Sequence, residues 1–321
     1  TIDQNTSVAA VTITAGALSS TSVTPASLVA GAAGNNTVAF TTANAIPADG
    51  KIVVTFPSGF TLSSGGATAA SSASNIDGTL TAAVSGQVVT VTRSGGTSSA
   101  AGSKSFVLSN IKNPAVTGLT GTFQIKTTTT GDVKINEDTA VAGVTITAGA
   151  LTSVSVTPAS LVAGASGNVT VAFVNPNAIP TNGDVQVTFP SGFDLTGVGS
   201  TSASSAADIT GTLTASVSGQ VLTVNLGSGL SANTTVDDLI IASVKNPVVS
   251  GATGTFAIET QNASDVKIDE GTGAAVTITA GSLSSTSVTP ASLVAGAAGN
   301  NTVAFTTANA IPADGKIVVT F

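Results

Sequence analysis

Carboxylates, amines, hydroxyls and amides are the only reactive side chains that this sequence offers. The chain has no His, Cys, Met, Trp or Tyr, and only nine Lys and Arg beside sixteen Asp and Glu. Catalysis near neutral pH usually relies on His, on a Cys thiolate or on a carboxylate tuned by burial. Zinc, copper and iron sites need imidazole or thiolate ligands, which leaves only the oxygen-ligand metals calcium and magnesium. We therefore expect no enzyme activity and no cofactor.

Two matching acidic segments are the best candidates for a metal site. Each precedes a copy of the sequence VTIT. The acids are Asp132, Glu137 and Asp138 in the first segment and Asp265, Asp269 and Glu270 in the second. Calcium takes six to eight oxygen ligands in flexible geometry, so such clusters could stiffen a domain junction. The favoured interpretation is a solvated acidic loop, because the spacing fits no calcium loop and Lys134 and Lys267 lie among the acids.

Two lysines precede Asn-Pro steps and raise the question of a covalent crosslink. Lys112 is followed by Asn113, and Lys245 by Asn246, at equivalent places in two copies. Pilin-like sandwiches sometimes carry Lys–Asn isopeptide bonds. A lysine beside a Pro-containing turn is more often solvent-facing, so we favour exposed lysines over a crosslink.

Asn-x-Ser/Thr sequons are candidate sites for N-linked glycans. They occur at Asn5, Asn35, Asn168, Asn233, Asn262 and Asn300. Three of them (Asn35, Asn168, Asn300) recur at one place in successive copies, where Gly-rich sequence predicts an exposed turn. Chance in a Ser/Thr/Asn-rich chain, followed by duplication, is the alternative explanation.

Other classes of function lack their sequence signals. Hydrolase, P-loop, EF-hand and dinucleotide-binding motifs are absent. The net charge is −7 with no basic cluster, and aromatic residues are 3%, all of them Phe. Nucleic-acid binding needs grouped Lys and Arg or exposed aromatic rings, so we expect none. No apolar run approaches the roughly 20 residues that span a bilayer.

A long internal repeat dominates the sequence. The run VTITAG begins at Val11, Val144 and Val276, in steps of 133 and 132 residues. The third copy differs from the first at one of 46 comparable positions, Ala17 against Ser282. The second copy differs more, which indicates a two-domain super-repeat of 265 residues. We expect this array to continue beyond the third copy.

The apolar residues alternate with polar ones, which predicts strands. In residues 51–56, Ile52, Val54 and Phe56 are expected to point inward, and Lys51 and Val53 towards solvent or a contact. Residues 37–40 repeat the pattern, with Val38 and Phe40 inward. The segments 79–84 and 87–92 flank Ser85-Gly86, a two-residue hairpin signal. With later strands near 104–108 and 121–125, each repeat has about seven strands, the number typical of an immunoglobulin-like sandwich.

The repeat also predicts domain boundaries. We expect VTIT to be the last strand of one domain, with the next domain starting near Leu18. Residues 1–17 then end a preceding repeat, 18–149 and 150–281 are whole repeats, and 282–321 begin a third. The fold class expected is all-β, with tandem immunoglobulin-like β-sandwich domains.

The repeat motifs resemble those of large microbial surface proteins. The motifs are S-V-T-P with a following A-G, I-P-A-D-G, V-T-F-P-S-G-F, and a late N-P before T-G-T-F. They are similar to the tandem Ig-like modules of S-layer-type proteins, giant adhesins and extracellular fibre proteins. That resemblance covers both whole repeats and implies export, a cell-surface location and a structural or adhesive role.

The leading hypothesis is a structural segment of an extracellular filament or surface layer whose partners are neighbouring copies of itself. Charged residues are only 8%, against about a quarter in ordinary soluble proteins. A surface buried against other copies explains that shortage. The alternative is the stalk of a giant adhesin that projects a distant binding domain. A sugar-binding or enzymatic module is a third reading, for which the titrating and aromatic groups are missing.

Overall fold

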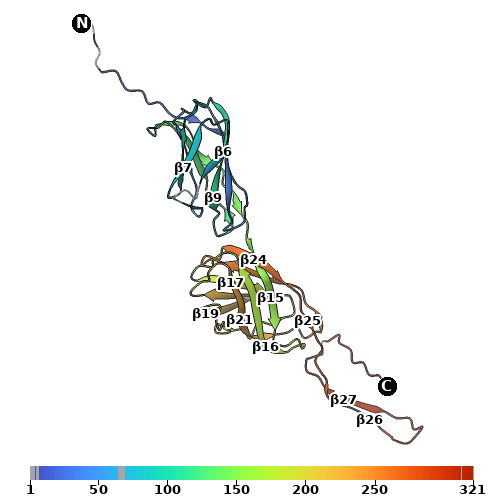
Figure 1. The fold of residues 1–321 in the computed structure, drawn as a ribbon. Coiled ribbons are helices and arrows are strands. Elements are labelled where there is room, and N and C mark those ends of the chain that lie inside the picture. Colours follow the sequence, from blue (N-terminus) through green and yellow to red (C-terminus); the bar gives the residue numbers. More distant parts are fainter. Residues whose placement is uncertain (1–3, 5–6, 64–68, 312, 321) are drawn as a thin grey trace. The chain divides into compact units, whose positions relative to one another are not determined.

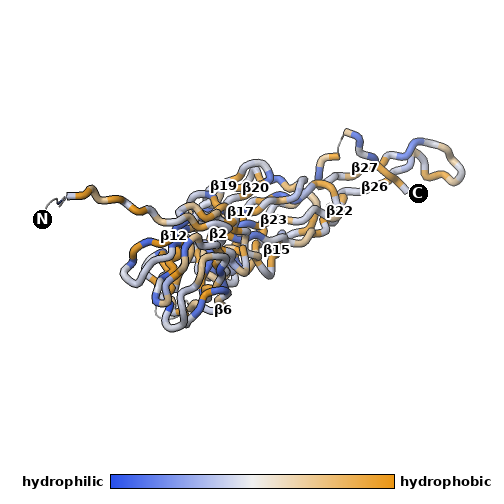
Figure 2. Tube along the Cα trace, turned by 90° about the horizontal axis from the view of Figure 1, so that it is seen from above, coloured by the Kyte–Doolittle hydropathy of each residue, from blue (hydrophilic) through white to orange (hydrophobic). Residues whose placement is uncertain are grey.

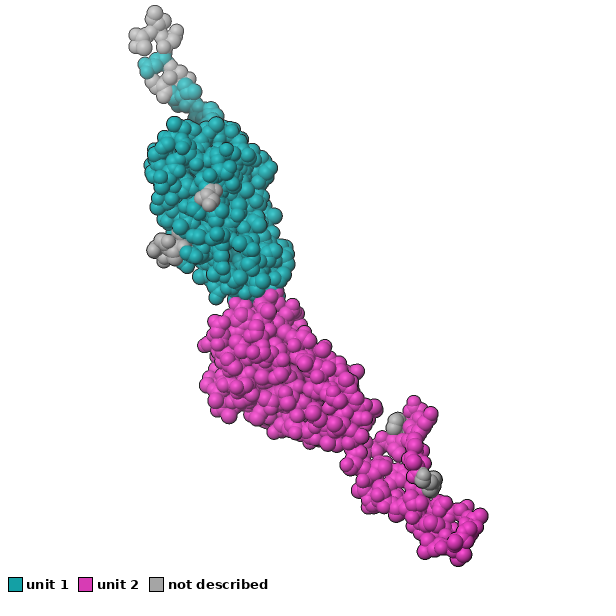
Figure 3. All heavy atoms as spheres, turned by 45° about the vertical axis from the view of Figure 1, so that its right-hand side comes forward, with its two compact units in different colours: residues 1–147 teal, residues 148–321 magenta. Residues whose placement is uncertain are grey.

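The computed structural model describes residues 4, 7–63, 69–311 and 313–320, and over these residues it contains strands and turns but no helix (Figure 1). The chain divides into two compact units, residues 1–147 and 148–321 (Figure 3). No helix long and apolar enough to cross a membrane occurs in the part described.

The first unit consists of two antiparallel sheets with one parallel edge strand. One sheet has the order β1-β12-β11-β4-β8-β7, and the other β2-β3-β9-β5, with β6 also paired to β9. The strands are β1 (Gly16–Ala17), β2 (Ser19–Pro25), β3 (Ala33–Thr42), β4 (Lys51–Thr55), β5 (Thr61–Leu62), β6 (Ala70–Ser74), β7 (Thr79–Ser85), β8 (Val88–Ser94), β9 (Gly102–Lys112), β10 (Gly118–Leu119), β11 (Phe123–Thr128), β12 (Lys134–Val141) and β13 (Thr145–Ile146). β10 and β13 form a small separate sheet.

The second unit repeats this arrangement. Its sheets have the orders β14-β24-β23-β17-β20-β19 and β15-β16-β21-β18, and β22 pairs with β25. The strands are β14 (Gly149–Ala150), β15 (Thr152–Pro158), β16 (Ser166–Asn175), β17 (Gly183–Thr188), β18 (Ala203–Ser204), β19 (Leu213–Ser218), β20 (Val221–Leu226), β21 (Thr234–Lys245), β22 (Gly251–Ala252), β23 (Phe256–Gln261), β24 (Lys267–Gly273) and β25 (Thr277–Ile278).

Each unit buries the alternating apolar face between its two sheets. In the first unit Val38, Ile52 and Val54 are fully buried. Phe56 packs edge-on against Phe123, with ring centroids 5.4 Å apart. The same cluster recurs in the second unit with Phe189, Phe193 and Phe256. The prediction of all-β, immunoglobulin-like sandwich repeats is confirmed, and short edge strands such as β5 and β18 add to the main ones.

Two local predictions need correction. Val53 was expected to face solvent or a contact, but its side chain is buried, with 8% exposed. β4 is a central strand, so Lys126 on β11 and Thr90 on β8 flank Val53 and cover it. The hairpin loop is Gly86-Gln87, one residue later than predicted, because Gly86 takes the positive φ of 57° that the turn requires.

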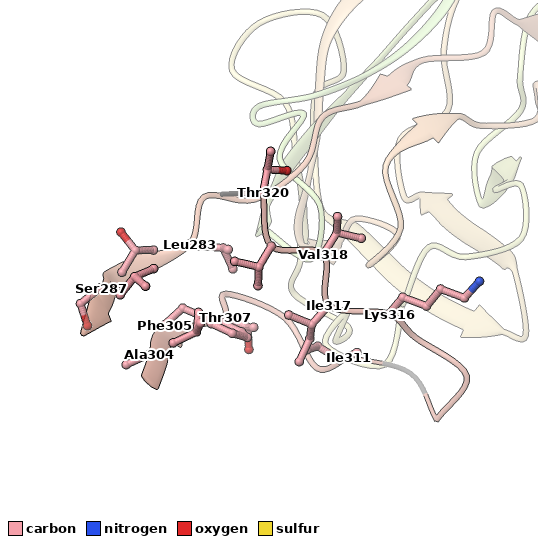
Figure 4. A pocket seen from close by; sticks show the side chains of 14 residues that line it. Leu283, Ser287, Ala304, Phe305, Thr307, Ile311, Lys316, Ile317, Val318 and Thr320 are labelled. Atoms are coloured by element: carbon pink, nitrogen blue, oxygen red, sulfur yellow. The ribbon is translucent and has the colours of Figure 1, made fainter. Parts of the chain in front are cut away.

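The start of the third copy lies within the second unit as an unaccompanied hairpin. It consists of β26 (Ser284–Pro290) and β27 (Asn301–Thr306). Val288 and Val303 are 50% and 37% exposed, whereas their counterparts Val23 and Val38 in the first copy are 2% and 0% exposed. Beside them a hollow of about 580 Å³ is lined by third-copy side chains such as Phe305, Ile311 and Ile317 (Figure 4).

The N-terminal arm shows the same contrast. Residues 7–15 form no strand, and a hydrophobic stretch follows the N-terminus along this arm (Figure 2). Ile13 is 85% exposed, whereas its counterparts Ile146 and Ile278 are 2% and 1% exposed. The arm therefore carries the sequence of a closing strand without the neighbours that bury it elsewhere. The predicted boundaries 1–17, 18–149, 150–281 and 282–321 stay a prediction; Gly16 and Ala17 pair with β12 of the first unit, and 282–321 group with the second.

Candidate functional site at the repeat end

A short loop with the sequence SLVAGA forms one end of each sandwich. It covers residues 27–32 in the first unit and 160–165 in the second, and we refer to it as the SLVAGA loop. The loop follows Pro25 or Pro158, which ends the first long strand. Gly31 and Gly164 both take φ of 66°, a left-handed conformation that favours glycine. The loop therefore has the same backbone turn in both units.

An asparagine from the Asn-Pro step holds this loop. Asn113 is buried, and its Nδ2 donates to the carbonyl oxygens of Ser27 at 2.7 Å and Val29 at 3.0 Å. In the second unit Asn246 makes the same two bonds, to Ser160 at 2.6 Å and Val162 at 3.0 Å. One amide group therefore donates to two loop carbonyls, of which Val29 O and Val162 O also accept from Ala32 N and Ala165 N at 3.2 and 3.1 Å.

The VTIT segment adds a parallel strand to the other side of the loop. Thr147 N donates to Leu28 O, and Ala30 N donates to Thr147 O, both at 2.8 Å. Thr279 repeats these bonds with Leu161 at 2.7 Å and Ala163 at 2.8 Å. β13 and β25 also pair with β10 and β22, which buries Ile146 and Ile278. VTIT thus closes the sandwich that precedes it.

In the second unit the same loop also contacts the third copy. Asn309 Nδ2 donates to Ala163 O at 2.8 Å. A Cβ placed on Gly164 would lie 1.7 Å from Asn309 Oδ1, so only glycine leaves room for this contact. The SLVAGA loop therefore binds three partners within this unit: the Asn-Pro asparagine, the closing strand and the opening of the next copy.

A buried polar cluster lies beneath the counterparts of Asn309 in the two whole repeats. In the first unit Asn44 donates to Asn136 Oδ1 through its backbone N at 3.0 Å and its side chain at 3.2 Å. In the second unit Asn177 Nδ2 donates to Asp269 Oδ1 at 2.7 Å. Burial raises the pKa of Asp269, and the hydrogen bonds from Asn177 and Thr260 oppose that shift. A carboxylate therefore replaces an amide at one buried position of the repeat.

The six acids predicted near the junctions do not come together. Among the described residues, no three His, Cys, Asp or Glu side chains lie close enough to hold a metal ion. Glu137 and Asp138 belong to β12, and Asp269 and Glu270 to β24, so the expected acidic loop is wrong for them. Their partners are separate. Asp132 pairs with Lys51, Glu137 with Lys134, and Glu270 with Lys267, each at 2.8 Å, while Asp138 accepts from Thr21 and Asp269 is buried. Asp265 lies in the turn before β24 with a φ of 58°.

The lysines considered for crosslinking are Lys112 and Lys245. Among the described residues, no bond joins either lysine to an asparagine side chain. Lys112 is exposed at the end of β9, and Lys245 is half-buried at the end of β21. Asn113 and Asn246 use their amides for the SLVAGA loop, a role that the sequence interpretation missed. The signal was available, because an identical Asn-Pro step follows the long strand in both repeats.

The sequon asparagines occupy different environments. Asn35 and Asn168 are exposed, but they lie at register shifts within β3 and β16, so the predicted turn is wrong for them. Asn300 is exposed just before β27, and Asn233 is exposed with a φ of 58°. Asn262 is half-buried, and its Oδ1 accepts from Ser264 N and Val266 N. Asn5 lies outside the described residues, and glycosylation stays a prediction at all six.

Comparison with known proteins gives remote similarities. No family model matches the sequence, and no curated protein matches it. Among solved structures, the chain is similar to the Actinomyces fimbrial adhesin FimA (13% identity, TM-score 0.25, covering 82% of this chain and 96% of that one). It is also similar to the type II cohesin dyad of the adaptor scaffoldin ScaA from Acetivibrio cellulolyticus (9%, 0.24, 77% and 94%) and to the collagen adhesin of S. aureus (11%, 0.23, 82% and 96%).

Proposed function

We propose that this chain is a structural segment of a repetitive extracellular filament or surface layer that assembles through its β-sandwich repeats. The role is mechanical and not enzymatic. The proposal includes export and a location at the cell surface. Neighbouring copies of the repeat are the partners.

The contact between the SLVAGA loop and Asn309 is the observation that carries the proposal. The loop, the VTIT strand and the T-x-A-N or N-P-N segment that supplies the asparagine recur in every copy. A contact whose two sides are both present in each repeat can be formed again by the next repeat. Such a chain of contacts needs no ligand and no catalytic group.

The surface composition also supports assembly. Charged residues are 8% of the chain, and the strand residues Val288 and Val303 of the third-copy hairpin are 50% and 37% exposed. Exposed apolar strands favour pairing with further β structure. In the first copy the counterparts of these residues, Val23 and Val38, are buried within a complete sandwich. We expect the third copy to bury its apolar residues against another part of such a repeat.

Electron microscopy of the full chain, with two glycine variants, tests the proposal. The native chain should give regular filaments or sheets. Gly164→Ala should abolish that regularity, since its Cβ collides with Asn309 and its φ is positive. Gly167→Ala is the matched control, because nothing lies within 4 Å of its Cβ and its φ is ordinary. Monodisperse single chains from the native sequence would contradict lateral assembly and favour the adhesin stalk. Equally regular assemblies from Gly164→Ala and Gly167→Ala would show that assembly does not depend on the contact between the loop and Asn309.

A further inference from the structure

Two cations are buried close together in the first unit. Arg93 on β8 is 1% exposed, and Lys104 on β9 is 5% exposed. Such residues are rarely buried unless they are paired with an acid. In a chain with nine Lys and Arg, two buried in one loop cluster need an explanation.

Arg93 is fully used by the backbone around it. Its Nε and Nη2 donate to Asp77 O at 3.0 and 2.6 Å, and Nη2 also donates to Thr97 O at 2.9 Å. Its Nη1 donates to Ile46 O at 2.9 Å and to Pro47 O. All these acceptors are neutral carbonyls, so the guanidinium orders three loops while its charge is not neutralised by direct contact.

Lys104 retains an unused donor. Its Nζ donates to Ala100 O at 2.6 Å and to Asn75 O at 3.2 Å. An ammonium group has three N–H donors, and within the described part of the chain the third has no acceptor and no carboxylate lies within ion-pair distance. Burial lowers the pKa of Lys104, and repulsion from Arg93 lowers it further. An added anion would relieve both costs.

A hollow of about 500 Å³ lies against this lysine. Its lining includes Lys104, Ser99, Ser103, Asn75 and Asp77. The other lining residues are Ile76, Ala100, Ala101 and Gly102, so the lining contains no aromatic ring. The Asp77 carboxylate is occupied by Gly78 N at 2.9 Å and by Thr97 N at 2.7 Å. Lys104 is the only basic residue of the lining, and Arg93 lies behind it with both Asp77 and Asp49 nearby.

The second repeat lacks this arrangement. The position of Arg93 is occupied by Leu226 and that of Lys104 by Val236, since Phe40 pairs with Lys104 and its counterpart Phe173 pairs with Val236; both replacements are fully buried and apolar. Both cations are therefore changed together, and the second unit provides an internal control. The second repeat forms the same sandwich without a lysine at this position. The fold alone therefore does not explain why Lys104 is buried.

We propose that the hollow beside Lys104 binds a small anionic group, a carboxylate or sulfate carried by a polar molecule of one or two sugar rings. Lys104 Nζ forms the ion pair with its third N–H, and Arg93 contributes its charge from behind. The hydroxyls of Ser99 and Ser103 and the nearby backbone suit the hydroxyls of a sugar. This site is independent of the contacts proposed for assembly.

An NMR titration of the full chain tests this site, with glucuronate, inorganic sulfate and neutral glucose as probes. Glucuronate and sulfate should shift the backbone amides of residues 99–104 and leave their counterparts 230–236 unchanged, and glucose should shift neither. Lys104→Met should weaken glucuronate binding about tenfold or more, which is the scale of one charge-assisted hydrogen bond. Lys104→Arg should retain binding, and Lys112→Met is the control at an exposed lysine. Added sodium chloride should weaken binding of the native chain, which tests the ion pair without any variant.

Each result bears on the proposal. Glucuronate binding more tightly than sulfate identifies an acidic sugar as the ligand, and equal binding identifies a free anion. Equal shifts from glucose and glucuronate, or unchanged binding by a folded Lys104→Met chain, would overturn the proposal. Shifts confined to the second unit would overturn it too. If Lys104→Met does not fold, absence of a salt effect on the native chain would be sufficient to reject the ion pair.

Discussion

The two whole repeats share their ends and differ in their interiors. The SLVAGA loop, the Asn-Pro step and VTIT are identical in both, and their hydrogen bonds agree closely in length. Inside the sandwich, Asn36 and Arg93 of the first unit are replaced by Val169 and Leu226 in the second. At one further position the second unit gains an ionisable group, since Asn136 is replaced by Asp269.

The shared end is the part of each repeat that contacts the closing strand and the next copy. The interior, which differs between the units, only has to fill the space between the two sheets. A core tolerates exchange when volume and local partners are kept. The end loop is less free to change, because three successive carbonyls, those of Ser27, Leu28 and Val29, accept hydrogen bonds from Asn113 or Thr147 outside the loop. Exchanging residues between the two units is therefore a direct way to test which differences are neutral.

The largest effect is expected from giving the first unit the second unit's leucine. Arg93→Leu removes the five hydrogen bonds that the guanidinium donates to the carbonyls of Ile46, Pro47, Asp77 and Thr97. We expect the first unit to lose about 3–5 kcal/mol of unfolding free energy, because several carbonyls lose a charged donor at once and each such loss costs about 1–3 kcal/mol. Calorimetry should show one transition shifted to lower temperature and the other unchanged.

The reciprocal change is the control. Leu226→Arg introduces a charge into a site without Asp77 or its loop, so it should destabilise the second unit by at least as much. An Arg93→Leu chain as stable as the native one would mean that the loops of the first unit close without the guanidinium.

The next effect concerns the end that the repeats share. Asn113→Ala should cost about 2–3 kcal/mol in the first unit, because Ser27 O and Val29 O lose one donor each. Asn246→Ala should cost the same in the second unit. Urea unfolding of the single variants measures both, and Lys112→Ala next door should be neutral. Unequal losses of stability in Asn113→Ala and Asn246→Ala would show that the two loops differ in energy although their hydrogen-bond lengths agree.

Much of this fold was predictable from the sequence, because strands have a period that residues report directly. Val38 and Phe40 on one strand, and Ile52 and Val54 on another, stand two residues apart, and all four are buried as expected. The hairpin error was one residue, since Ser85-Gly86 and Gly86-Gln87 place the same glycine in the turn. Val53 was misjudged because alternation shows the side of a sheet but not what covers it.

The site was less predictable, because its important groups act through the backbone. An asparagine that donates to two carbonyls has no motif of its own. In the sequence Asn113 and Asn246 stand out only as neighbours of lysines, whereas the structure gives them the central hydrogen bonds of the loop. Arg93 and Lys104 lie eleven residues apart on adjoining elements, and nothing in their spacing indicates that both are buried.

The buried acid of the second unit gives a pH-dependent difference. Burial raises the pKa of Asp269 above its ordinary value of 3.8, so the folded state favours the protonated carboxyl. The resulting stabilisation is complete below the unfolded pKa and is lost as pH rises through the folded pKa. Asp269→Asn, the residue of the first unit, should therefore raise the stability of the second unit at neutral pH, by about 1–2 kcal/mol.

Thermal unfolding of Asp269→Asn and of the native chain from acid to neutral pH measures this effect as a difference. The unfolding temperature of the native second unit should fall relative to that of the variant as pH rises. Burial also raises the pKa of Asp184, so the variant keeps part of the pH dependence and only the difference belongs to Asp269. Parallel curves at all pH values would show that Asp269 has the same protonation in folded and unfolded chains.

The smallest effect should be a gain in stability. Asn36 is 1% exposed, and its Oδ1 has no hydrogen-bond partner among the described residues. Its counterpart Val169 fills the same strand position with a β-branched side chain that packs well in a sheet. Asn36→Val should therefore stabilise the first unit by about 1 kcal/mol, since it removes an unsatisfied buried oxygen and adds apolar contact. Val169→Asn should destabilise the second unit by at least that amount in the same urea measurement. If Asn36→Val lowers stability instead, the amide has a partner in solution, and the polar interior of the first unit is then a requirement of its fold and not a tolerated substitution.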